Sequence, residues 1–254
     1  MPLQVTTFGS GPDIALLHGW GFGRGVWKEI ASRLAEDFRL HLISLPGYDG
    51  SAPDARDFDA TASALIETLP AGSTLCGWSM GGMLALAAAA YHPNHFARLV
   101  LVGTTPKFVQ GSDWAPALSD KTLEAFLHCV LQAPVITLAS FITLLSRSDP
   151  RASYISHHLE ALLENELPTV SVLEKGLTWL HDVDLRQLIS QVTLPTLIVH
   201  GEQDPLIPAS AAIWLAATLR YARLQLFADT AHAPFASNPD HFCSMLTEFC
   251  SDPI

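Results

Sequence analysis

The pentapeptide Gly77-Trp78-Ser79-Met80-Gly81 constrains the fold of this chain more than any other feature. It follows the apolar run Thr74–Cys76 and precedes residues 82–90, which are rich in Ala and Leu and favour a helix. A G-x-S-x-G sequence between a strand and a helix is typical of a sharp turn that exposes a nucleophilic serine. Such a turn leaves almost no room for side chains two residues before and after the serine. The first N–H groups of the helix then point toward negative charge that develops beside Ser79 Oγ.

Short apolar runs with β-strand character alternate with helical segments along the chain. This alternation predicts a mostly parallel sheet that is covered by helices on both faces. We expect strands at Leu3–Phe8, Ile14–Leu17, Leu40–Leu45, Thr74–Gly77, Leu99–Gly103, Leu197–Gly201 and Leu224–Phe227, and helices around Val26–Ala35, Ala60–Thr68, Met80–Tyr91, Ala209–Leu219 and Pro239–Cys250.

The alternation is interrupted once, between Pro106 and Asp184. There the strand-like runs stop, and four amphipathic helical stretches follow, separated by Pro134, Pro150 and Pro168. We therefore expect an all-helical cap at residues 106–185, inserted into a core of residues 1–105 and 186–254. A cap in this position covers the carboxyl ends of the strands, where α/β proteins bind their ligands.

Composition and charge exclude several classes of function. No apolar stretch reaches the roughly 20 residues that span a bilayer, and the first residues lack the basic and apolar regions of a signal peptide, so we expect a cytoplasmic protein. We separately expect it to be a monomer. The net charge of −11 and the absence of a basic run argue against nucleic-acid binding. The four cysteines lack C-x-x-C spacing, and the glycines of Gly19–Gly23 do not fit a dinucleotide-binding motif. We expect neither a metal nor a cofactor.

A serine nucleophile needs a histidine base that a carboxylate orients. Asp204 follows the predicted strand Leu197–Gly201, and His232 follows the last predicted strand in a loop of small residues. Of the eleven histidines only His232 has this placement. Glu202 is the competing acid, although it lies at the very start of its loop. The order serine, acid, histidine predicts a catalytic triad of Ser79, Asp204 and His232.

Acyl transfer also needs two N–H donors for the oxyanion, each contributing roughly 3–4 kcal/mol. One is expected at Met80, directly after the nucleophile. The other is expected at Trp20, in the loop His18-Gly19-Trp20-Gly21 that follows the strand Ile14–Leu17. These two amides form the predicted oxyanion hole.

Four segments together resemble one known family: His18–Gly21, Gly77–Gly82, His181–Arg186 and Ala231–Phe235. They are similar to the pimeloyl-[acyl-carrier-protein] methyl ester esterases of bacterial biotin synthesis, which belong to the α/β-hydrolase superfamily. The resemblance runs over nearly the whole chain and is weakest in the cap. It implies an α/β-hydrolase fold, with a mostly parallel central sheet flanked by helices and an inserted all-helical cap.

The resemblance also implies a substrate, a partner and a set of substrate-binding residues. The substrate is a methyl ester at the end of a seven-carbon acyl chain that an acyl-carrier protein holds. By resemblance, the substrate-binding residues are Trp20, Ser79, Met80, Phe141, Ile142, Thr143, Leu144, Leu145 and His232. From spacing alone, Phe141–Leu145 fits a core-facing helix stripe equally well.

The charge of the cap departs from the basic surface that an acidic carrier protein prefers. Residues 106–185 hold five Lys and Arg against ten Asp and Glu, a net charge of −5. Docking then requires Arg147 and Arg151 to form a local basic patch. A carboxylesterase that acts generally on small, short-chain esters is therefore an alternative, as is a carbon–carbon bond hydrolase. A third alternative is a hydrolase-fold ligand receptor whose slow turnover serves signalling.

Overall fold

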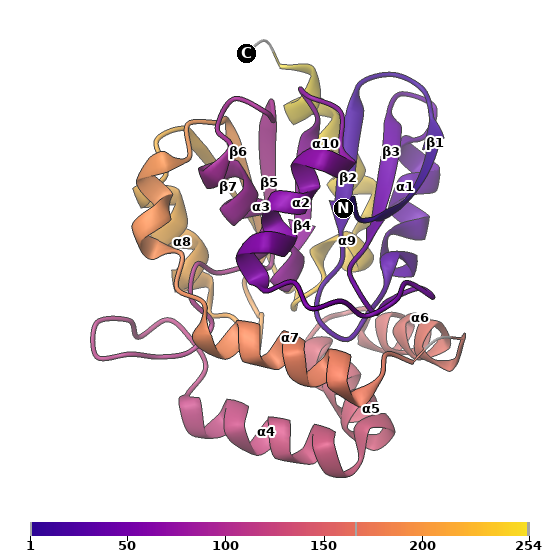
Figure 1. The fold of residues 1–254 in the computed structure, drawn as a ribbon, viewed down its shortest axis with the longest axis vertical. Coiled ribbons are helices and arrows are strands. Elements are labelled where there is room, and N and C mark those ends of the chain that lie inside the picture. The colour runs from indigo at the N-terminus through magenta and orange to yellow at the C-terminus, as the bar shows by residue number, and fades with distance from the viewer. Residues whose placement is uncertain (1, 166, 253–254) are drawn as a thin grey trace.

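A single sheet forms the centre of the molecule in the computed structural model, which describes residues 2–165 and 167–252. The strands are β1 (Gln4–Gly9), β2 (Asp13–Leu17), β3 (Arg39–Ser44), β4 (Thr74–Trp78), β5 (Arg98–Val102), β6 (Thr196–Gly201) and β7 (Ala222–Phe227). Within the described residues their order in the sheet is β1-β3-β2-β4-β5-β6-β7 (Figure 1). All neighbours pair in parallel except β1, which is antiparallel to β3. The predicted fold class is thereby confirmed.

The burial of each strand follows from its place in the sheet. Every residue of β4, β5 and β6 is buried, as expected for central strands that helices cover on both faces. In contrast, β1 is almost entirely exposed, because it lies at the sheet edge and has no alternating apolar face. The strand that carries the Ser79 turn therefore lies at the rigid centre of the sheet.

Helices cover both faces of the sheet. They are α1 (Lys28–Leu34), α2 (Phe58–Thr68), α3 (Met80–Tyr91), α8 (Ala209–Thr218), α9 (Pro234–Ser237) and α10 (Pro239–Ser251), with the 3-10 turns η1 (Arg24–Trp27) and η2 (Arg186–Gln191). Helices α1 and α10 pack together on one face, and α2 and α3 pack together on the other (Figure 1). Residues Met80–Ala90 of α3 are all buried, because alanines and glycines allow this helix to lie close against the sheet. The predicted helix Val26–Ala35 is divided between η1 and α1.

Four helices lie between β5 and β6: α4 (Asp120–Gln132), α5 (Pro134–Leu145), α6 (Ala152–Asn165) and α7 (Val170–Asp182). The prolines that separate the predicted helical stretches lie at or just before the starts of α5, α6 and α7, where a missing N–H costs no helical hydrogen bond. Helices α4 and α7 pack together below the carboxyl ends of the strands (Figure 1). We propose that residues 106–185 form the cap and the remaining residues the core. Within the described residues, no helix has the length and apolar character needed to cross a membrane.

Candidate active site

Ser79 occupies the sharp turn between β4 and α3, with a φ of +54°. The two glycines of the motif are required by backbone crowding. A Cβ on Gly77 would lie 2.3 Å from the carbonyl oxygen of Gly81, and a Cβ on Gly81 would lie 2.4 Å from that of His18. No side chain fits at either position, which is the physical reason for the spacing of the motif.

The loop after β2 lies directly against Ser79, because β2 is the neighbour of β4 in the sheet. A Cβ on Gly19 would lie 3.3 Å from the Cβ of Ser79. The Gly19–Trp20 peptide, which carries the first predicted oxyanion donor, therefore lies beside the nucleophile. The other predicted oxyanion donor is the N–H of Met80. Met80 is the first residue of α3, where an N–H has no acceptor within its own helix.

His18 holds this loop in place as a neutral imidazole. Its Nδ1 lies 2.9 Å from the carbonyl oxygen of Gly19, and its Nε2 lies 3.1 Å from the backbone N–H of Leu45. The backbone N–H can only donate, so Nε2 accepts and Nδ1 carries the proton. Complete burial lowers the pKa of His18 and keeps this form at neutral pH.

Asp204 and His232 form a buried pair, with 2.7 Å between Asp204 Oδ2 and His232 Nδ1. The other carboxylate oxygen accepts the backbone N–H groups of Leu206 and Ile207 at 2.9 and 3.0 Å. Burial acts to raise the pKa of Asp204, but His232 and these hydrogen bonds outweigh it and hold the pKa below its usual value. Asp204 is therefore an ionised acceptor that orients the imidazole. The competing acid Glu202 is exposed to solvent.

A second buried histidine, His200, lies next to the same carboxylate. Its Nε2 is 3.5 Å from Asp204 Oδ2 but only 2.8 Å from the carbonyl oxygen of Ile207, to which it donates. Burial lowers the pKa of His200, so this imidazole remains neutral beside the Asp204–His232 pair. Its role is to support the loop that carries Asp204.

An apolar cavity opens over Ser79, between the core and the cap. The empty space within it and at its mouth, open solvent included, measures about 590 Å³. It is lined by Trp20, Ser79, Phe108, Leu118, Thr122, Leu123, Phe126, Phe141, Leu144, Leu177, Leu180, Pro205 and Leu206. The lining favours an acyl chain over a polar substrate.

Trp20 forms one wall of this cavity and is fixed by the cap. Its indole N–H donates to the carbonyl oxygen of Leu173 in α7 at 2.8 Å. The rings of Phe126 and Phe141 pack edge-on against it, with centroid distances of 5.4 and 5.2 Å. Thus α4, α5 and α7 each contribute to holding the loop that carries a predicted oxyanion donor.

The cavity includes only part of the predicted run Phe141–Leu145. Phe141 and Leu144 line it, whereas Ile142 and Leu145 are fully buried in other packing and Thr143 is exposed. Residues three apart share a helix face, so consecutive residues of a helix do not all face one cavity. Phe126 and Leu177 were not predicted, because an apolar residue on an amphipathic helix gives the same sequence pattern whether it packs or lines a cavity.

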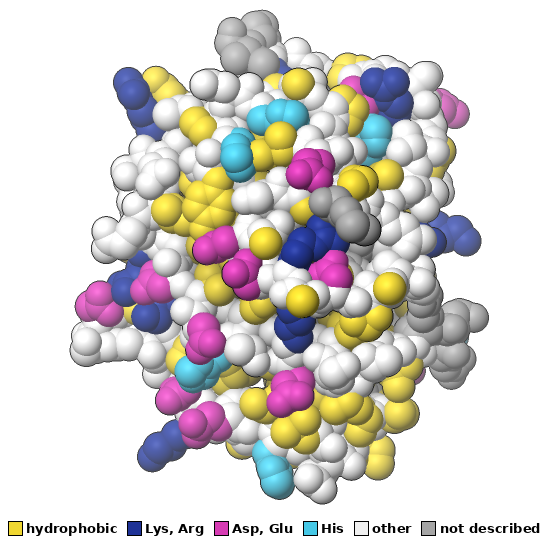
Figure 2. All heavy atoms as spheres, in the orientation of Figure 1, with side chains coloured by type: hydrophobic (Ala, Val, Ile, Leu, Met, Phe, Trp, Pro, Cys, Tyr) yellow, Lys and Arg dark blue, Asp and Glu magenta, His cyan; other side chains and the backbone are white. Residues whose placement is uncertain are grey.

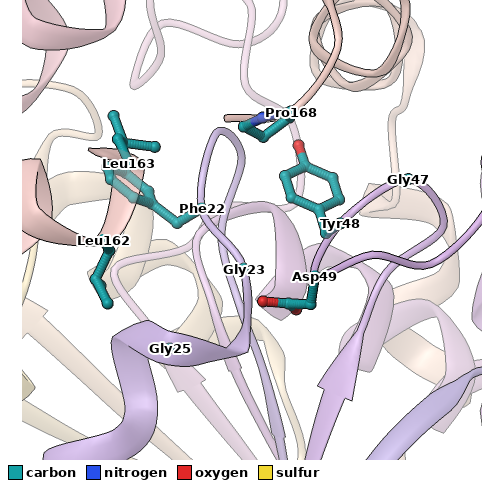
Figure 3. Close-up of a pocket in the computed structure, with 9 residues that line it drawn as sticks. All are labelled: Phe22, Gly23, Gly25, Gly47, Tyr48, Asp49, Leu162, Leu163 and Pro168. Carbon is teal, nitrogen blue, oxygen red and sulfur yellow. The ribbon is translucent and has the colours of Figure 1, made fainter. Parts of the chain in front are cut away.

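A second cavity lies between the core loops and α6 (Figure 3). Figure 3 shows Phe22, Leu162 and Leu163 on one side and Tyr48 and Asp49 on the other. None of the predicted triad residues lines this cavity. Asp49 is already engaged, because its carboxylate accepts the backbone N–H of Arg24 at 2.9 Å and lies 3.8 Å from the Arg24 guanidinium.

The remaining predicted positions differ in their surroundings. Arg147 is exposed, whereas the Arg151 guanidinium donates to the carbonyl oxygen of Ser237 at 3.0 Å and stacks 4.2 Å from the ring centre of Tyr154. Arg151 is therefore partly engaged within the molecule. Within the described residues, no cluster of three or more His, Cys, Asp or Glu side chains is arranged to hold a metal ion.

Comparisons with known proteins agree with this fold. A family model described as the alpha/beta hydrolase fold matches residues 14–239. The chain is 38% identical over 244 residues to the pimeloyl-[acyl-carrier protein] methyl ester esterase of Nitrosomonas europaea, covering 95% of this chain and 97% of the relative. It is 34% identical over 253 residues to the protein of the same name from Vibrio cholerae, covering 99% of both.

Among solved structures, a bromoperoxidase from Bacillus anthracis superposes with a TM-score of 0.90 at 21% identity, covering 98% of this chain and 95% of that one. An esterase from Exiguobacterium antarcticum superposes with a TM-score of 0.87 at 23% identity, covering 98% and 96%. These two likenesses establish the fold. The chain belongs to the α/β-hydrolase family and, within it, to the pimeloyl-[acyl-carrier protein] methyl ester esterases, which are carboxylic ester hydrolases.

Proposed function

We propose that this esterase hydrolyses the methyl ester of pimeloyl-acyl-carrier protein in biotin synthesis, through a Ser79–His232–Asp204 triad and an acyl-enzyme. The observation that carries the proposal is the buried Asp204–His232 pair, together with the apolar cavity over Ser79. The names of the relatives support the choice of substrate. We further place the enzyme in the cytoplasm, as a monomer.

In the first half of the reaction, Ser79 Oγ attacks the ester carbonyl carbon and its proton passes to His232 Nε2. The negative charge on the carbonyl oxygen is stabilised by the N–H groups of Trp20 and Met80. His232 then gives its proton to the departing methoxide, the bond between carbon and methoxide oxygen breaks, and methanol leaves.

In the second half, His232 removes a proton from water, and the resulting hydroxide attacks the acyl-enzyme carbonyl. The bond to Ser79 Oγ breaks, and the proton on His232 returns to the serine. The free carboxylic acid leaves. Asp204 stays ionised throughout and stabilises the imidazolium that forms twice in the cycle.

The cavity suits the proposed acyl chain, because its walls are mainly apolar and come from both the core and the cap. Figure 2 shows acidic and basic side chains scattered over the face of the molecule that it presents, with apolar side chains gathered over the lower part. The exposed apolar side chains of the cap include Leu131, Val135 and Ile136. A carrier protein that docks on the cap meets these exposed apolar side chains in addition to the net negative charge of the cap.

A general short-chain carboxylesterase is the second candidate, because the cap has a net charge of −5 and Arg151 is partly engaged. The two candidates are separated by comparing kcat/KM for pimeloyl methyl ester on acyl-carrier protein with that for p-nitrophenyl butyrate. An advantage of at least about 100-fold for the carrier-bound ester supports the proposal. Equal or better cleavage of the free ester supports the alternative.

The role of Ser79 is tested separately with Ser79→Ala, which removes only the hydroxyl. We expect loss of turnover on both substrates, with unchanged near-UV circular dichroism. Retained turnover in this variant would falsify the triad. The matched control is Ser140→Ala, which removes an exposed hydroxyl on α5 that bonds only within its own helix turn.

A further inference from the structure

Asp149 is a buried carboxylate of the cap that contacts the loop carrying His232. It lies in the turn between α5 and α6, and only 6% of its surface is exposed. Its Oδ2 accepts the backbone N–H of Ala231 at 3.0 Å, and its Oδ1 accepts the hydroxyl of Ser237 at 2.9 Å. One carboxylate thus binds the chain immediately before His232 and again at the end of the short helix after it.

Asp149 also has a local role, which does not account for these bonds. Its Oδ1 accepts the backbone N–H of Arg151 at 2.8 Å, forming a turn that starts α6. A turn of this kind needs no partner outside its own segment. The bonds to Ala231 and Ser237 join residues 82 and 88 positions apart in the sequence.

The same cap segment holds the His232 loop by its backbone as well. The carbonyl oxygen of Leu145 accepts the backbone N–H of His232 at 3.1 Å. The Arg151 guanidinium donates to the carbonyl oxygen of Ser237 at 3.0 Å. The direction of the imidazole depends on this backbone, because the ring is attached to it by only two rotatable bonds.

We propose that Asp149 is a positioning residue, whose carboxylate fixes the backbone on both sides of His232 and so directs the imidazole toward Ser79. It contacts no reacting atom. A carboxylate has two acceptor oxygens, so one side chain accepts hydrogen bonds from both segments at once, which suits it to hold a loop. A misplacement of about 1 Å in a catalytic group can reduce the rate about 100-fold. The proposal rests on the proposed role of His232 as the general base.

The test uses Asp149→Ala and Asp149→Asn in the full chain. Alanine removes every acceptor. Asparagine keeps one oxygen and replaces the other with an N–H donor, so the backbone N–H of either Ala231 or Arg151 loses its acceptor. Turnover of p-nitrophenyl butyrate is measured per active site, with the sites counted by stoichiometric labelling with a fluorophosphonate. We expect kcat per labelled site to fall by about 10- to 100-fold in Asp149→Ala and by less in Asp149→Asn, with KM within about threefold.

Counting sites separates positioning from folding. If Asp149 only stabilises the fold, its loss lowers the number of sites that can be labelled, while kcat per site stays unchanged; that result overturns the proposal. The control Glu160→Gln makes the same change of charge at an exposed position of α6, and is expected to leave kcat per site unchanged. A matching loss in the control also overturns the proposal, because it would make the effect one of cap charge.

A milder variant covers the case in which neither Asp149 variant folds. Ser237→Ala removes one donor to the carboxylate and leaves the Ala231 bond in place. We expect a loss of about threefold in kcat per site, and an unchanged value overturns the proposal. Ser79→Ala and His232→Ala are measured in parallel. Activity in either of them rejects the triad itself, whereas inactivity of both with normal turnover in the Asp149 variants rejects only the positioning role.

Discussion

The indole N–H of Trp78 donates to the carbonyl oxygen of His232 at 2.9 Å, joining residues 154 positions apart. Trp78 immediately precedes Ser79, so this bond connects the turn of the predicted nucleophile to the backbone of the predicted base. Both side chains are almost completely buried, and their rings lie 5.5 Å apart. The distance between the loops that carry Ser79 and His232 is therefore set partly from within the core, independently of the cap.

Replacing Trp78 by Phe removes this donor and leaves a buried carbonyl with one partner fewer. An unpaired buried polar group costs about 1–3 kcal/mol, so we expect the free energy of unfolding to fall by that amount. We also expect a lower kcat, because the His232 backbone loses a restraint. Urea unfolding and steady-state kinetics measure the two effects. A variant as stable and as active as the parent would contradict the argument.

Replacing Asp204 by Asn tests the orientation of the imidazole. The amide keeps the size of the side chain but no longer stabilises an imidazolium, and it favours the wrong tautomer of His232. By analogy with serine hydrolases that share this arrangement, we expect kcat to fall about 10⁴-fold with little change in KM. Glu202→Gln is the control, because Glu202 is exposed on the same loop. A comparable loss of kcat in Glu202→Gln would mean that the loop as a whole, and not the Asp204 carboxylate, orients His232.

Replacing Gly81 by Ala tests the crowding at the turn. Its Cβ would lie 2.4 Å from one carbonyl oxygen and 2.7 Å from another, and neither backbone atom can move aside without displacing a strand end. We expect a loss of more than about 3 kcal/mol in the free energy of unfolding, well above the cost of a typical surface substitution. At the exposed Gly111 the nearest atoms to a Cβ lie 3.4 Å or more away. Gly111→Ala should therefore be nearly neutral in the same unfolding experiment.

Replacing Phe141 by Ala removes one wall of the cavity and the ring that packs on Trp20. We expect KM to rise about 10-fold for p-nitrophenyl heptanoate and much less for the acetate, because only the longer chain reaches this wall. Kinetics across a series of acyl lengths measures the difference. An equal change for all lengths would mean that Phe141 supports Trp20 and does not contact the chain.

Because of the ion pair between Asp13 and Arg39, we expect the free energy of unfolding to fall at acidic pH. Hydrogen bonds from Arg39 lower the pKa of Asp13 to about 2, burial opposes this, and His41 adds to the lowering. Because this pKa lies below its usual value of 3.8, the stabilisation is complete above about pH 4 and disappears as the pH falls toward 2. Asp13→Asn should thus differ most from the parent at pH 5 and least near pH 2, in urea unfolding across this range. A difference that is constant with pH would contradict the assignment.

The candidate site residues that the sequence indicated are those tied to a local pattern. Ser79, Asp204 and His232 each follow a strand in a recognisable loop, and the glycines around Ser79 report the crowding that the structure measures. All seven predicted strands belong to the sheet, including the weakly marked edge strand β1.

What the sequence did not reveal depends on contacts between distant segments. Asp149 precedes a proline at the start of a helix, and that pattern predicts only a turn. Its bond to Ala231 follows from how the cap meets the core, which no local pattern encodes. The same holds for the cavity wall, where Phe141 and Ile142 are neighbours in sequence but face different surroundings.

Two of the contacts from the cap to the loops of the candidate site end on main-chain oxygens: that of Leu173, which accepts from Trp20, and that of Leu145, which accepts from His232. Any amino acid supplies such an oxygen, so substitutions in the cap can reshape the acyl cavity and leave both acceptors in place. An inserted or deleted residue acts differently, because it turns the rest of the helix by about 100° and carries the acceptor away from its donor. To change the substrate range of this enzyme, one should therefore keep the lengths of α5 and α7 and vary the side chains that they carry.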